Sequence, residues 1–241
     1  MNVFSCGVLL LLTAGLASCT SGTGSLGDDD YRRLREEMVE KQLRARDITD
    51  EAVLAAMARV PRHLFVPPEM AASAYRDSPL PIGHGQTISQ PYMVALMTQL
   101  ARAAPGKKAL DVGTGSGYQA AVLAEIVDQV YSIEILPELA EAARRRLLRL
   151  GYEKVEVRCG DGYAGWPEHA PFDLIIVAAA PGEVPQPLIE QLAPGGRLLI
   201  PVGEMHQELV VIAKAEDGSI SRQAYGGVRF VPMTGEAQRR Q

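Results

Sequence analysis

One short turn contains three glycines, Gly113, Gly115 and Gly117. Of all the patterns in this chain, their spacing is the most direct indication of ligand binding. They follow an apolar run and open a segment rich in helix-forming residues. Glycine permits a positive φ and lets a ligand approach the main chain without a Cβ in the way. The free N–H groups at the start of the new helix would then point at that ligand. The turn therefore predicts a small-molecule site between a strand and a helix.

Acidic residues lie around this turn and suggest which ligand it takes. The dinucleotide fingerprint needs a glycine at the sixth position, which here is Tyr118, so the pattern does not favour NAD. Asp111 at the end of the first strand can reach a polar or cationic group over the turn. Glu134 ends the next strand, where a carboxylate is placed to accept both hydroxyls of a ribose. Asp161, in a tight turn after the third strand, is placed to accept from the exocyclic amine of a purine.

A second candidate for chemistry is the stretch from Leu80 to Pro91. It contains two prolines, two glycines and several small polar side chains, and no periodicity fits it. Loops of this kind carry function more often than cores do. His84 invites interpretation as a general base, but a loop histidine that makes one hydrogen bond is the simpler interpretation.

Alternating strands and helices must position these residues. A continuous apolar run over 172–178 is typical of a central parallel strand buried on both faces. The alternation predicts an α/β fold with a doubly wound, mostly parallel sheet, and ligands at the carboxyl ends of its strands. Strands are predicted over 109–112, 130–133, 155–159, 172–178, 197–201, 209–214 and 227–231, and helices over 92–101, 118–126, 137–150 and 185–192.

A small helical addition is predicted in front of the sheet. Tyr31, Leu34 and Met38 recur at helical spacing, and Thr49 is predicted to cap a second helix that ends at Pro61. We expect residues 31–79 to form this addition, 80–92 a substrate loop and 93–241 the α/β domain, with 31–241 as one compact unit.

Residues 1–30 resemble an export signal followed by a flexible tether. The apolar run Val8 to Ala17 has the length of a signal-peptide core, and the sequence up to Cys19 resembles a lipobox, but no Lys or Arg precedes the run. Met38 is an alternative start site. Two interpretations stay open: a lipid anchor at Cys19, or an extension without function. Contact with a membrane is expected only if Cys19 is lipidated.

Bulk composition narrows the class of partner. A length of 241 residues fits one large domain with a small addition. A net charge of −5 and a pI near 5.5 argue against a nucleic-acid partner, and we expect a monomer. Cys6, Cys19 and Cys159 are widely spaced and show no metal-ligand or disulfide pattern, so no metal is expected. Cys159 is predicted to be a small buried thiol.

At this point the residues resemble known families. The run from Asp111 to Gly117, Glu134 and the pair Asp161-Gly162 look like motifs of class I S-adenosylmethionine-dependent methyltransferases. The loop Pro81 to Tyr92 is more specific. Together with Val60-Pro-Arg-His-Leu-Phe-Val66 and Val228-Arg-Phe-Val-Pro232, it resembles the protein-L-isoaspartate O-methyltransferase family. The similarity runs from about residue 38 to residue 231.

The resemblance implies a Rossmann-like sheet of about seven strands and S-adenosyl-L-methionine as co-substrate. It implies methylation of the free α-carboxyl of isoaspartyl residues in damaged proteins and peptides. It further implies that Ser89 is the active-site serine. The implied cofactor-binding residues are Asp111, Gly113, Thr114, Gly115, Gly117, Glu134, Asp161 and Gly162, and the implied substrate-loop residues are Gly85, Gln86, Thr87, Ile88 and Gln90.

The implied chemistry agrees with the residue types present. A carboxylate with a pKa near ~4 is already ionised at neutral pH, so it needs no general base to attack a methyl group. Attack on a sulfonium annihilates charge, which a dry site favours. Ser89 is suited to hold the carboxylate through one hydrogen bond, and it can also cap the helix that begins near Pro91.

Two other functions remain open on sequence alone. The glycine turn and its acidic residues fit equally a methyltransferase for small-molecule carboxylates or amines. A second alternative is an anchored envelope protein that binds a nucleoside without catalysis. Because S-adenosylmethionine is made in the cytosol, we expect the catalytic domain in the cytoplasm; the alternative is a cell-envelope lipoprotein anchored at Cys19.

Overall fold

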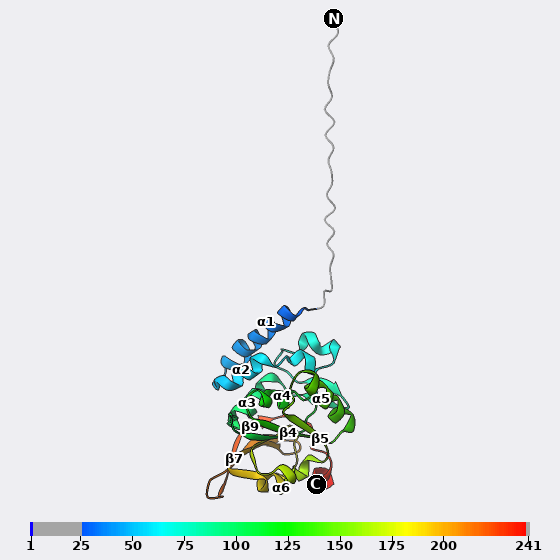
Figure 1. Ribbon diagram of the computed structural model, residues 1–241. Helices are drawn as coiled ribbons and strands as arrows, with labels where there is room; N and C mark the ends of the chain where they lie inside the picture. The colour runs from blue at the N-terminus through cyan, green and yellow to red at the C-terminus, as the bar shows by residue number, and fades with distance from the viewer. Residues whose placement is uncertain (2–25, 240–241) are drawn as a thin grey trace.

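Seven strands form one twisted sheet with the spatial order β5-β4-β3-β6-β7-β8-β9. The computed structural model describes Met1 and residues 26–239, shown in Figure 1. Strands β5 to β7 in this order are parallel, and β8 and β9 are antiparallel to their neighbours. This confirms the predicted doubly wound, mostly parallel sheet. The strands are β3 (Lys108–Val112), β4 (Gln129–Glu134), β5 (Val155–Cys159), β6 (Phe172–Val177), β7 (Leu192–Val202), β8 (Gln207–Lys214) and β9 (Ile220–Val228).

Helices cover both faces of this sheet. In Figure 1, α3, α4 and α5 lie on the side of the sheet that faces the N-terminal helices, and α6 lies on the opposite side. The 3₁₀ segments Gly162–Ala164 and Pro167–His169 follow β5. The helices are α3 (Pro91–Leu100), α4 (Tyr118–Ala124), α5 (Pro137–Arg149), α6 (Gln186–Glu190) and α7 (Glu236–Arg239).

The central strand β6 divides the core into two apolar layers. Leu174 and Ile176 belong to the layer that contains the N-terminal helices, α3 and α4. Ile175 and Val177 belong to the other layer, together with Leu188 of α6. Successive strand residues point to opposite faces, so a strand buried on both sides needs an unbroken apolar run, as the sequence indicated.

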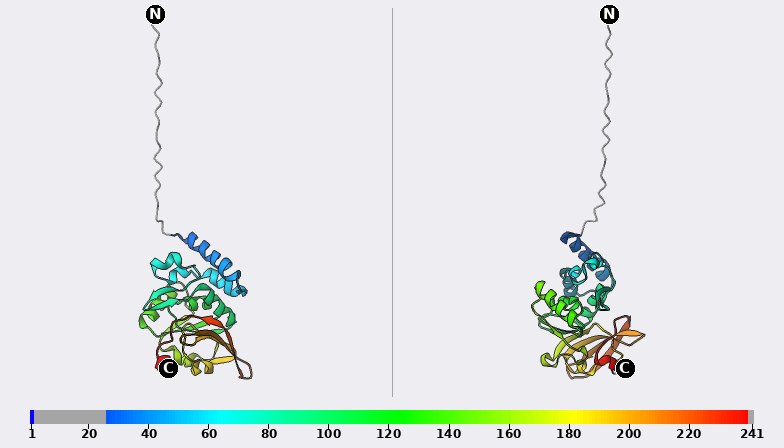
Figure 2. Two further views of the ribbon diagram at one scale, coloured as in Figure 1. Left: turned by 180° about the vertical axis from the view of Figure 1, so that it is seen from behind. Right: turned by 90° about the vertical axis from the view of Figure 1, so that its right-hand side faces the viewer.

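The N-terminal helices pack on the same apolar layer. Tyr31 of α1 stacks on His63 with ring centroids 3.9 Å apart, the Arg35 Nε donates to the Ala58 carbonyl at 2.6 Å, and Met38 is fully buried. Both views in Figure 2 place these helices at the end of the molecule opposite the C-terminal helix. The elements are α1 (Asp28–Met38), a π-helical turn (Val39–Arg44), α2 (Glu51–Arg59) and 3₁₀ segments at Arg62–Phe65 and Pro68–Ser73.

The aperiodic stretch after these helices is a β-hairpin. Strand β1 (Leu80–Gly83) pairs with β2 (Gln86–Ile88), and the turn between them places His84 at φ 53° and Gly85 at φ 71°. His84 is exposed there. The short strands and the turn glycines explain why no periodicity was visible.

Three local predictions were wrong. Asp50, not Thr49, caps α2, because the carboxylate of Asp50 accepts from the N–H groups of Ala52 and Val53. Cys159 is exposed at the end of β5. The last strand covers 220–228, not 227–231, because it is an exposed edge strand without an apolar pattern. Residues after Val228 instead run across the carboxyl end of the sheet.

The prediction of a signal-like segment and of lipidation at Cys19 lies outside the described residues. Within residues 26–239, no helix is both long and apolar enough to cross a bilayer.

Candidate active site

A cavity lies at the carboxyl ends of the strands, beside the point where the strand order reverses between β3 and β6. This is where ligands bind in open α/β sheets. Nine of the predicted site residues line it: Gln86, Thr87, Ile88, Ser89, Gly113, Thr114, Gly115, Glu134 and Gly162. The hairpin and the glycine turn, far apart in the sequence, therefore face the same space.

The glycine turn is anchored to the neighbouring strand. The carbonyl of Ile133 accepts from the N–H groups of Gly113 at 2.8 Å and Thr114 at 3.1 Å. Gly113 has φ 92° and Gly115 φ 52°, values that favour glycine. The N–H groups of Gly113 and Thr114 are thus engaged by strand β4 rather than free. The turn shapes the cavity through its path and through the missing side chains of its glycines.

Glu134 joins the two loops at the cavity edge. Its Oε2 accepts from the Gly115 N–H at 2.7 Å and its Oε1 from the Leu136 N–H at 3.0 Å. The residue is 5% exposed and lines the cavity. Because each carboxylate oxygen has a second lone pair, Glu134 can hold both loops and still accept hydrogen bonds from a ligand.

Asp111 lies outside the cavity lining, fully buried within β3. Its Oδ2 accepts from the Ser132 hydroxyl at 2.7 Å, and Ser132 contacts the Thr114 hydroxyl at 2.5 Å. Its Oδ1 has no hydrogen-bond partner among the described residues. Burial raises the pKa of Asp111 to about 7. The hydrogen bond from Ser132 acts to lower this pKa, and the negative charge of Glu134 acts to raise it. Asp111 and Ser132 thus form a buried polar chain that reaches the cavity through Thr114.

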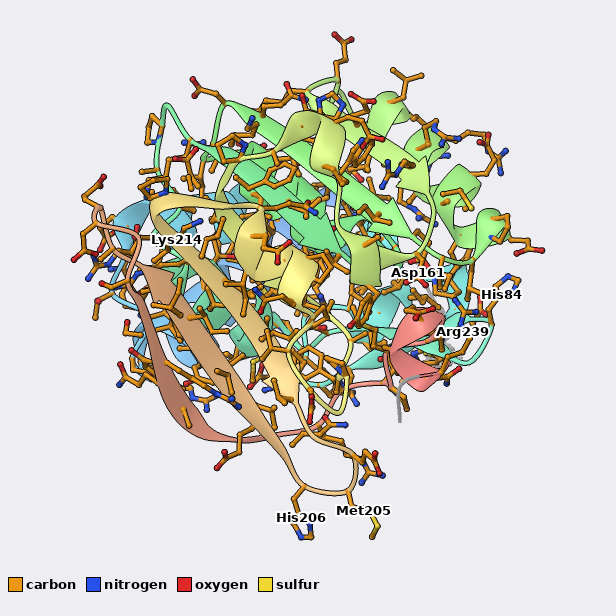
Figure 3. All side chains as sticks on the ribbon, turned by 90° about the horizontal axis from the view of Figure 1, so that it is seen from below. His84, Asp161, Met205, His206, Lys214 and Arg239 are labelled. Atoms are coloured by element: carbon orange, nitrogen blue, oxygen red, sulfur yellow. The ribbon has the colours of Figure 1, made fainter. Side chains whose placement is uncertain are left out.

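Asp161 also lies outside the lining, next to its neighbour Gly162, which lines the cavity. Its Oδ1 accepts from the Tyr163 N–H at 2.9 Å and its Oδ2 from the Glu236 N–H at 2.8 Å. Figure 3 shows Asp161 beside the C-terminal helix α7. Asp161 thus fixes the C-terminal segment over the cavity, and its contact with a purine stays a prediction.

Close packing requires glycine at positions 162 and 117. A Cβ on Gly162 would overlap Val112 Cγ1. Gly117 has φ 89°, and a Cβ there would lie 3.2 Å from two atoms of Leu147 on α5. Gly117 is therefore a helix-packing position, outside the cavity lining.

Several lining segments lie outside the predicted site residues. The C-terminal stretch Val231 to Thr234 closes one side, held by hydrogen bonds of Ala180 with Val231 and Met233. Val94 and Met97 of α3 with Ile133 and Ile135 supply apolar surface. Val94 and Met97 are buried residues of α3, and nothing in the local sequence distinguishes a core-facing residue from a cavity wall.

Ser89 lies at the boundary between this cavity and an open groove. The two spaces share Thr87, Ser89, Ala178 and Val231 in their linings. The Ser89 side chain makes no hydrogen bond to any residue in 26–239. The helix α3 begins with Gln90 as its N-cap and has no side-chain cap, so the predicted capping role of Ser89 was wrong.

The groove extends from Ser89 over the C-terminal ends of the hairpin and sheet. Gln90 and Tyr92 line one side and the segment Gly227 to Val231 the other. Figure 3 shows Met205 and His206 at the tip of the connection between β7 and β8, and both also line the groove. Gly85, at the hairpin turn, lines neither space.

Two side chains from the N-terminal helical addition hold the Ser89 segment. The Arg62 Nη2 donates to the Ser89 carbonyl at 2.7 Å, and the Asp77 Oδ1 accepts from the Tyr92 N–H at 3.0 Å. Arg46 in turn pairs with Asp77 at 3.1 Å and lies over the Tyr92 ring. The only sequence signal for Arg62 was the family-like motif around it.

No group of three or more His, Cys, Asp or Glu side chains in the described part of the chain has the arrangement of a metal site. The cavity therefore offers hydroxyl, carboxylate and backbone groups together with apolar walls. Such a lining suits an organic ligand that carries both a flat apolar group and hydroxyls.

Comparisons with known proteins point to one family. A family model described as protein-L-isoaspartate(D-aspartate) O-methyltransferase matches residues 33–238. The protein-L-isoaspartate O-methyltransferase of Gloeobacter violaceus is 58% identical over 201 residues, which cover 83% of this chain and 98% of that protein. Protein-L-isoaspartate O-methyltransferase 2 of Syntrophobacter fumaroxidans is 50% identical over 246 residues and covers 98% of this chain and 99% of its own length.

Solved structures with a similar fold carry the same family name. One described as a protein-L-isoaspartate O-methyltransferase superposes with a TM-score of 0.75 at 29% identity and covers 86% of this chain and 67% of that one. A candidate protein-L-isoaspartate O-methyltransferase of Plasmodium falciparum, in complex with S-adenosyl-L-homocysteine, superposes with a TM-score of 0.73 at 29% identity. It covers 83% of this chain and 98% of that one.

Proposed function

Since the chain belongs to the protein-L-isoaspartate(D-aspartate) O-methyltransferase family, we propose that its cavity holds S-adenosyl-L-methionine and that its groove presents an isoaspartyl peptide to Ser89. The reaction transfers a methyl group from S-adenosyl-L-methionine to the free α-carboxyl of an L-isoaspartyl residue. This begins the repair of damaged proteins and peptides.

The position of Ser89 carries the proposal. Ser89 lines both the cavity and the groove, so a donor in one space and an acceptor in the other would meet beside it. Its hydroxyl is not used by the protein itself, as described above. Ser89 therefore has a free donor at the junction where a carboxylate oxygen must approach the donor methyl.

The chemistry needs positioning rather than proton transfer. The α-carboxylate is ionised at neutral pH, and a hydroxyl can hold one of its oxygens without competing as a nucleophile. S-adenosyl-L-methionine supplies an electrophilic methyl on a positively charged sulfur. Val94, Met97, Ile133 and Ile135 give the cavity apolar walls, and an apolar site favours a reaction that annihilates charge. Alignment of the reacting groups can contribute roughly 7–11 kcal/mol at best.

The residues of the cavity fit the donor. Glu134 retains lone pairs for the two ribose hydroxyls. The glycine turn leaves space for a ligand above the strand ends, and a buried polar chain with the orphan Oδ1 of Asp111 lies close to Thr114. A nearby cationic ligand would favour the ionised form of Asp111, whose pKa burial raises to about 7.

The groove favours a peptide over a small molecule as acceptor. It is open to solvent and extends from Ser89 along Gly227 to Phe230 and past His206. A compact acceptor would need an enclosed pocket that surrounds it. An extended groove instead leaves room for residues on both sides of the isoaspartyl unit.

A paired assay tests the proposal. The full chain is incubated with radiolabelled S-adenosyl-L-methionine and either an isoaspartyl peptide or the same peptide with normal aspartate. We expect methylation of the isoaspartyl peptide alone. Ser89→Ala should lower turnover about 100-fold or more, as expected for misplaced reacting groups, with cofactor affinity within twofold of wild type by calorimetry.

The matched control is Ser221→Ala, since Ser221 lies on exposed strand β9. It should retain wild-type turnover. Equal methylation of both peptides, or unchanged turnover in Ser89→Ala, would contradict the assignment of substrate or residue respectively.

We further propose that the catalytic domain works as a monomer in the cytoplasm, where its methyl donor is made, and that translation starts upstream of Met38. The packing of Tyr31 and Leu34, which precede Met38 in α1, on the core supports the second point. Cell fractionation, N-terminal mass measurement and light scattering of the native chain test location, start site and oligomeric state. Recovery in the membrane fraction with a lipid mass on Cys19 would instead support the envelope lipoprotein.

A further inference from the structure

Arg62 is the largest fully buried side chain in the described part of the molecule. A guanidinium remains charged in proteins, and burial of an unpaired charge costs free energy. No carboxylate in residues 26–239 lies within ion-pair distance of Arg62, since it occurs in no salt bridge. The buried cation is therefore not explained by charge pairing.

Arg62 contacts three separate parts of the chain, and one of them is the Ser89 segment. Its Nε donates to the Ala74 carbonyl at 2.7 Å and its Nη2 to the Ser89 carbonyl at 2.7 Å. Its guanidinium carbon lies 4.7 Å from the ring centroid of Tyr118, a cation–π distance. Tyr118 is the first residue of α4 and lines the cofactor cavity. One side chain thus connects the N-terminal helical addition, the serine segment and the cavity wall.

We propose that Arg62 is a positioning residue for methyl transfer: its guanidinium fixes the backbone of Ser89 and thereby the place of the serine hydroxyl. This rests on the proposed function of Ser89. The planar fork of arginine can hold two carbonyls at fixed angles, whereas a lysine ammonium is a point charge. Displacement of a reacting group by about 1 Å can cost on the order of 100-fold in rate.

The experiment uses the full chain with R62K and, as a neutral second variant, R62Q, whose amide can donate to one carbonyl. We expect kcat/KM for an isoaspartyl peptide to fall tenfold or more, with S-adenosyl-L-methionine affinity within twofold of wild type. In the S89A background the same substitutions should lower kcat/KM less than twofold, because there is no hydroxyl left to misplace. A crystal structure of R62K should show Ser89 displaced and the glycine turn unmoved, a readout that needs no residual activity.

The matched control is R35K. Arg35 lies in the same N-terminal addition and donates through Nε to the Ala58 carbonyl at 2.6 Å, but it has no contact with the Ser89 segment. R35K should lower the thermal midpoint while kcat stays within twofold of wild type.

Several results would overturn the role of Arg62. These are unchanged kcat/KM in folded R62K and R62Q, an equal fall with and without Ser89, or a parallel loss of cofactor affinity. Failure of both variants to fold would show Arg62 to be a folding residue instead. If wild type itself does not methylate the isoaspartyl peptide, the proposed function fails, and the crystal structure of R62K still reports on the contact.

Discussion

The cofactor cavity and the serine segment are held in place by different kinds of contact. The cavity is framed by loops at the ends of β3, β4 and β6, and the contacts that fix it run between neighbouring strands, such as Glu134 to Gly115. The serine segment is fixed by Arg62 and Asp77, from a helical region earlier in the chain. One half of the site thus depends on the sheet, and the other on the packing of the N-terminal helices.

The difference teaches that the two halves can be damaged separately. Changes near the glycine turn should alter cofactor affinity or the stability of the sheet. Changes in the N-terminal contacts that reach the Ser89 segment, those of Arg62 and Asp77, should alter turnover with little effect on cofactor binding. The four predictions below test this separation, from the largest expected effect to the smallest.

The buried polar chain beneath the cavity should make stability depend on pH. The pKa of Asp111 is raised by burial to about 7 in the folded state, so between about pH 4 and pH 7 the folded state binds more protons than the unfolded state. Stability therefore falls as the pH rises through this window, by up to about 4 kcal/mol in total at 1.36 kcal/mol per unit of pKa shift. Urea unfolding of the apo chain at several pH values should show this fall, and D111N should flatten it.

The control is D217N. The pKa of exposed Asp217 is lowered by hydrogen bonds from Ser219, so its removal should leave the fall in stability between pH 4 and pH 7 in place. A wild-type chain whose stability is constant or rises across that window would contradict the protonation of Asp111.

Removal of the Glu134 carboxylate should weaken cofactor binding and leave peptide binding almost unchanged. E134A loses the acceptor for Gly115, Leu136 and the proposed ribose hydroxyls, and hydrogen bonds to charged groups contribute about 1.5–3 kcal/mol each. We expect S-adenosyl-L-methionine affinity to fall about 100-fold in calorimetry, which corresponds to about 2.7 kcal/mol. The KM for the peptide should change less than threefold at saturating cofactor.

Glu156 on neighbouring strand β5 is exposed, and E156A provides the comparison for loss of an acidic strand residue. Equal cofactor affinity in E134A and E156A would show that the glycine turn does not need its carboxylate partner.

A chain that begins at Met38 should damage the serine half. It lacks α1, in which Tyr31 and Leu34 pack on the core and Arg35 binds Ala58. Loss of two partly buried apolar side chains should cost about 2–3 kcal/mol of unfolding free energy, and turnover should fall more than cofactor affinity. Urea unfolding and steady-state kinetics measure both quantities.

A chain that begins at Gly27 retains all of α1 and should behave as the full chain does. If the Met38 chain matches it in stability and turnover, the N-terminal helix does not support the serine segment.

A methyl group on the glycine turn should have the smallest effect. In G115A the alanine would have to adopt φ 52°, and its Cβ would lie 3.2 Å from Ile82 Cδ1 of the hairpin. The left-handed conformation costs an L-residue about 1–2 kcal/mol. We expect that loss in urea unfolding and a fall of three- to tenfold in cofactor affinity, because the turn moves against the hairpin.

G106A measures the cost of the left-handed backbone conformation alone, without a close contact of the added Cβ. Gly106 has φ 81° with nothing within 4 Å of an added Cβ, so G106A should lose similar stability and retain cofactor affinity. Equal affinities in the two variants would mean that the path of the turn near Gly115 does not limit binding.

The elements that could be predicted are those with local signals. The apolar run of β6 and the glycine turn after β3 identified the sheet and the cavity, because burial on both faces and positive φ restrict which residues are allowed. The exposed edge strand β9 has neither restriction, and its prediction was displaced toward the apolar residues that follow it. Cys159 was predicted as buried from residue type alone, although its position at a strand end leaves it exposed.

The roles of the acidic residues show the limit of local reasoning. The sequence placed Asp111, Glu134 and Asp161 at the carboxyl edge of the sheet. It could not show that Asp111 is buried inside β3 or that Asp161 binds the backbone of Glu236. Such partners lie far away in the chain, and only folding determines which donor a carboxylate meets.

The sequence by itself determined the fold class, the glycine turn and the family resemblance carried by the loop that contains Ser89. Each of these depends on residue type at fixed local spacing. The tertiary structure alone decided that Ser89 lies between the cavity and the groove, and that Arg62 holds it 27 residues away. The physical reason is that hydrogen bonds act over about 3 Å in space, a proximity that local spacing along the chain does not encode.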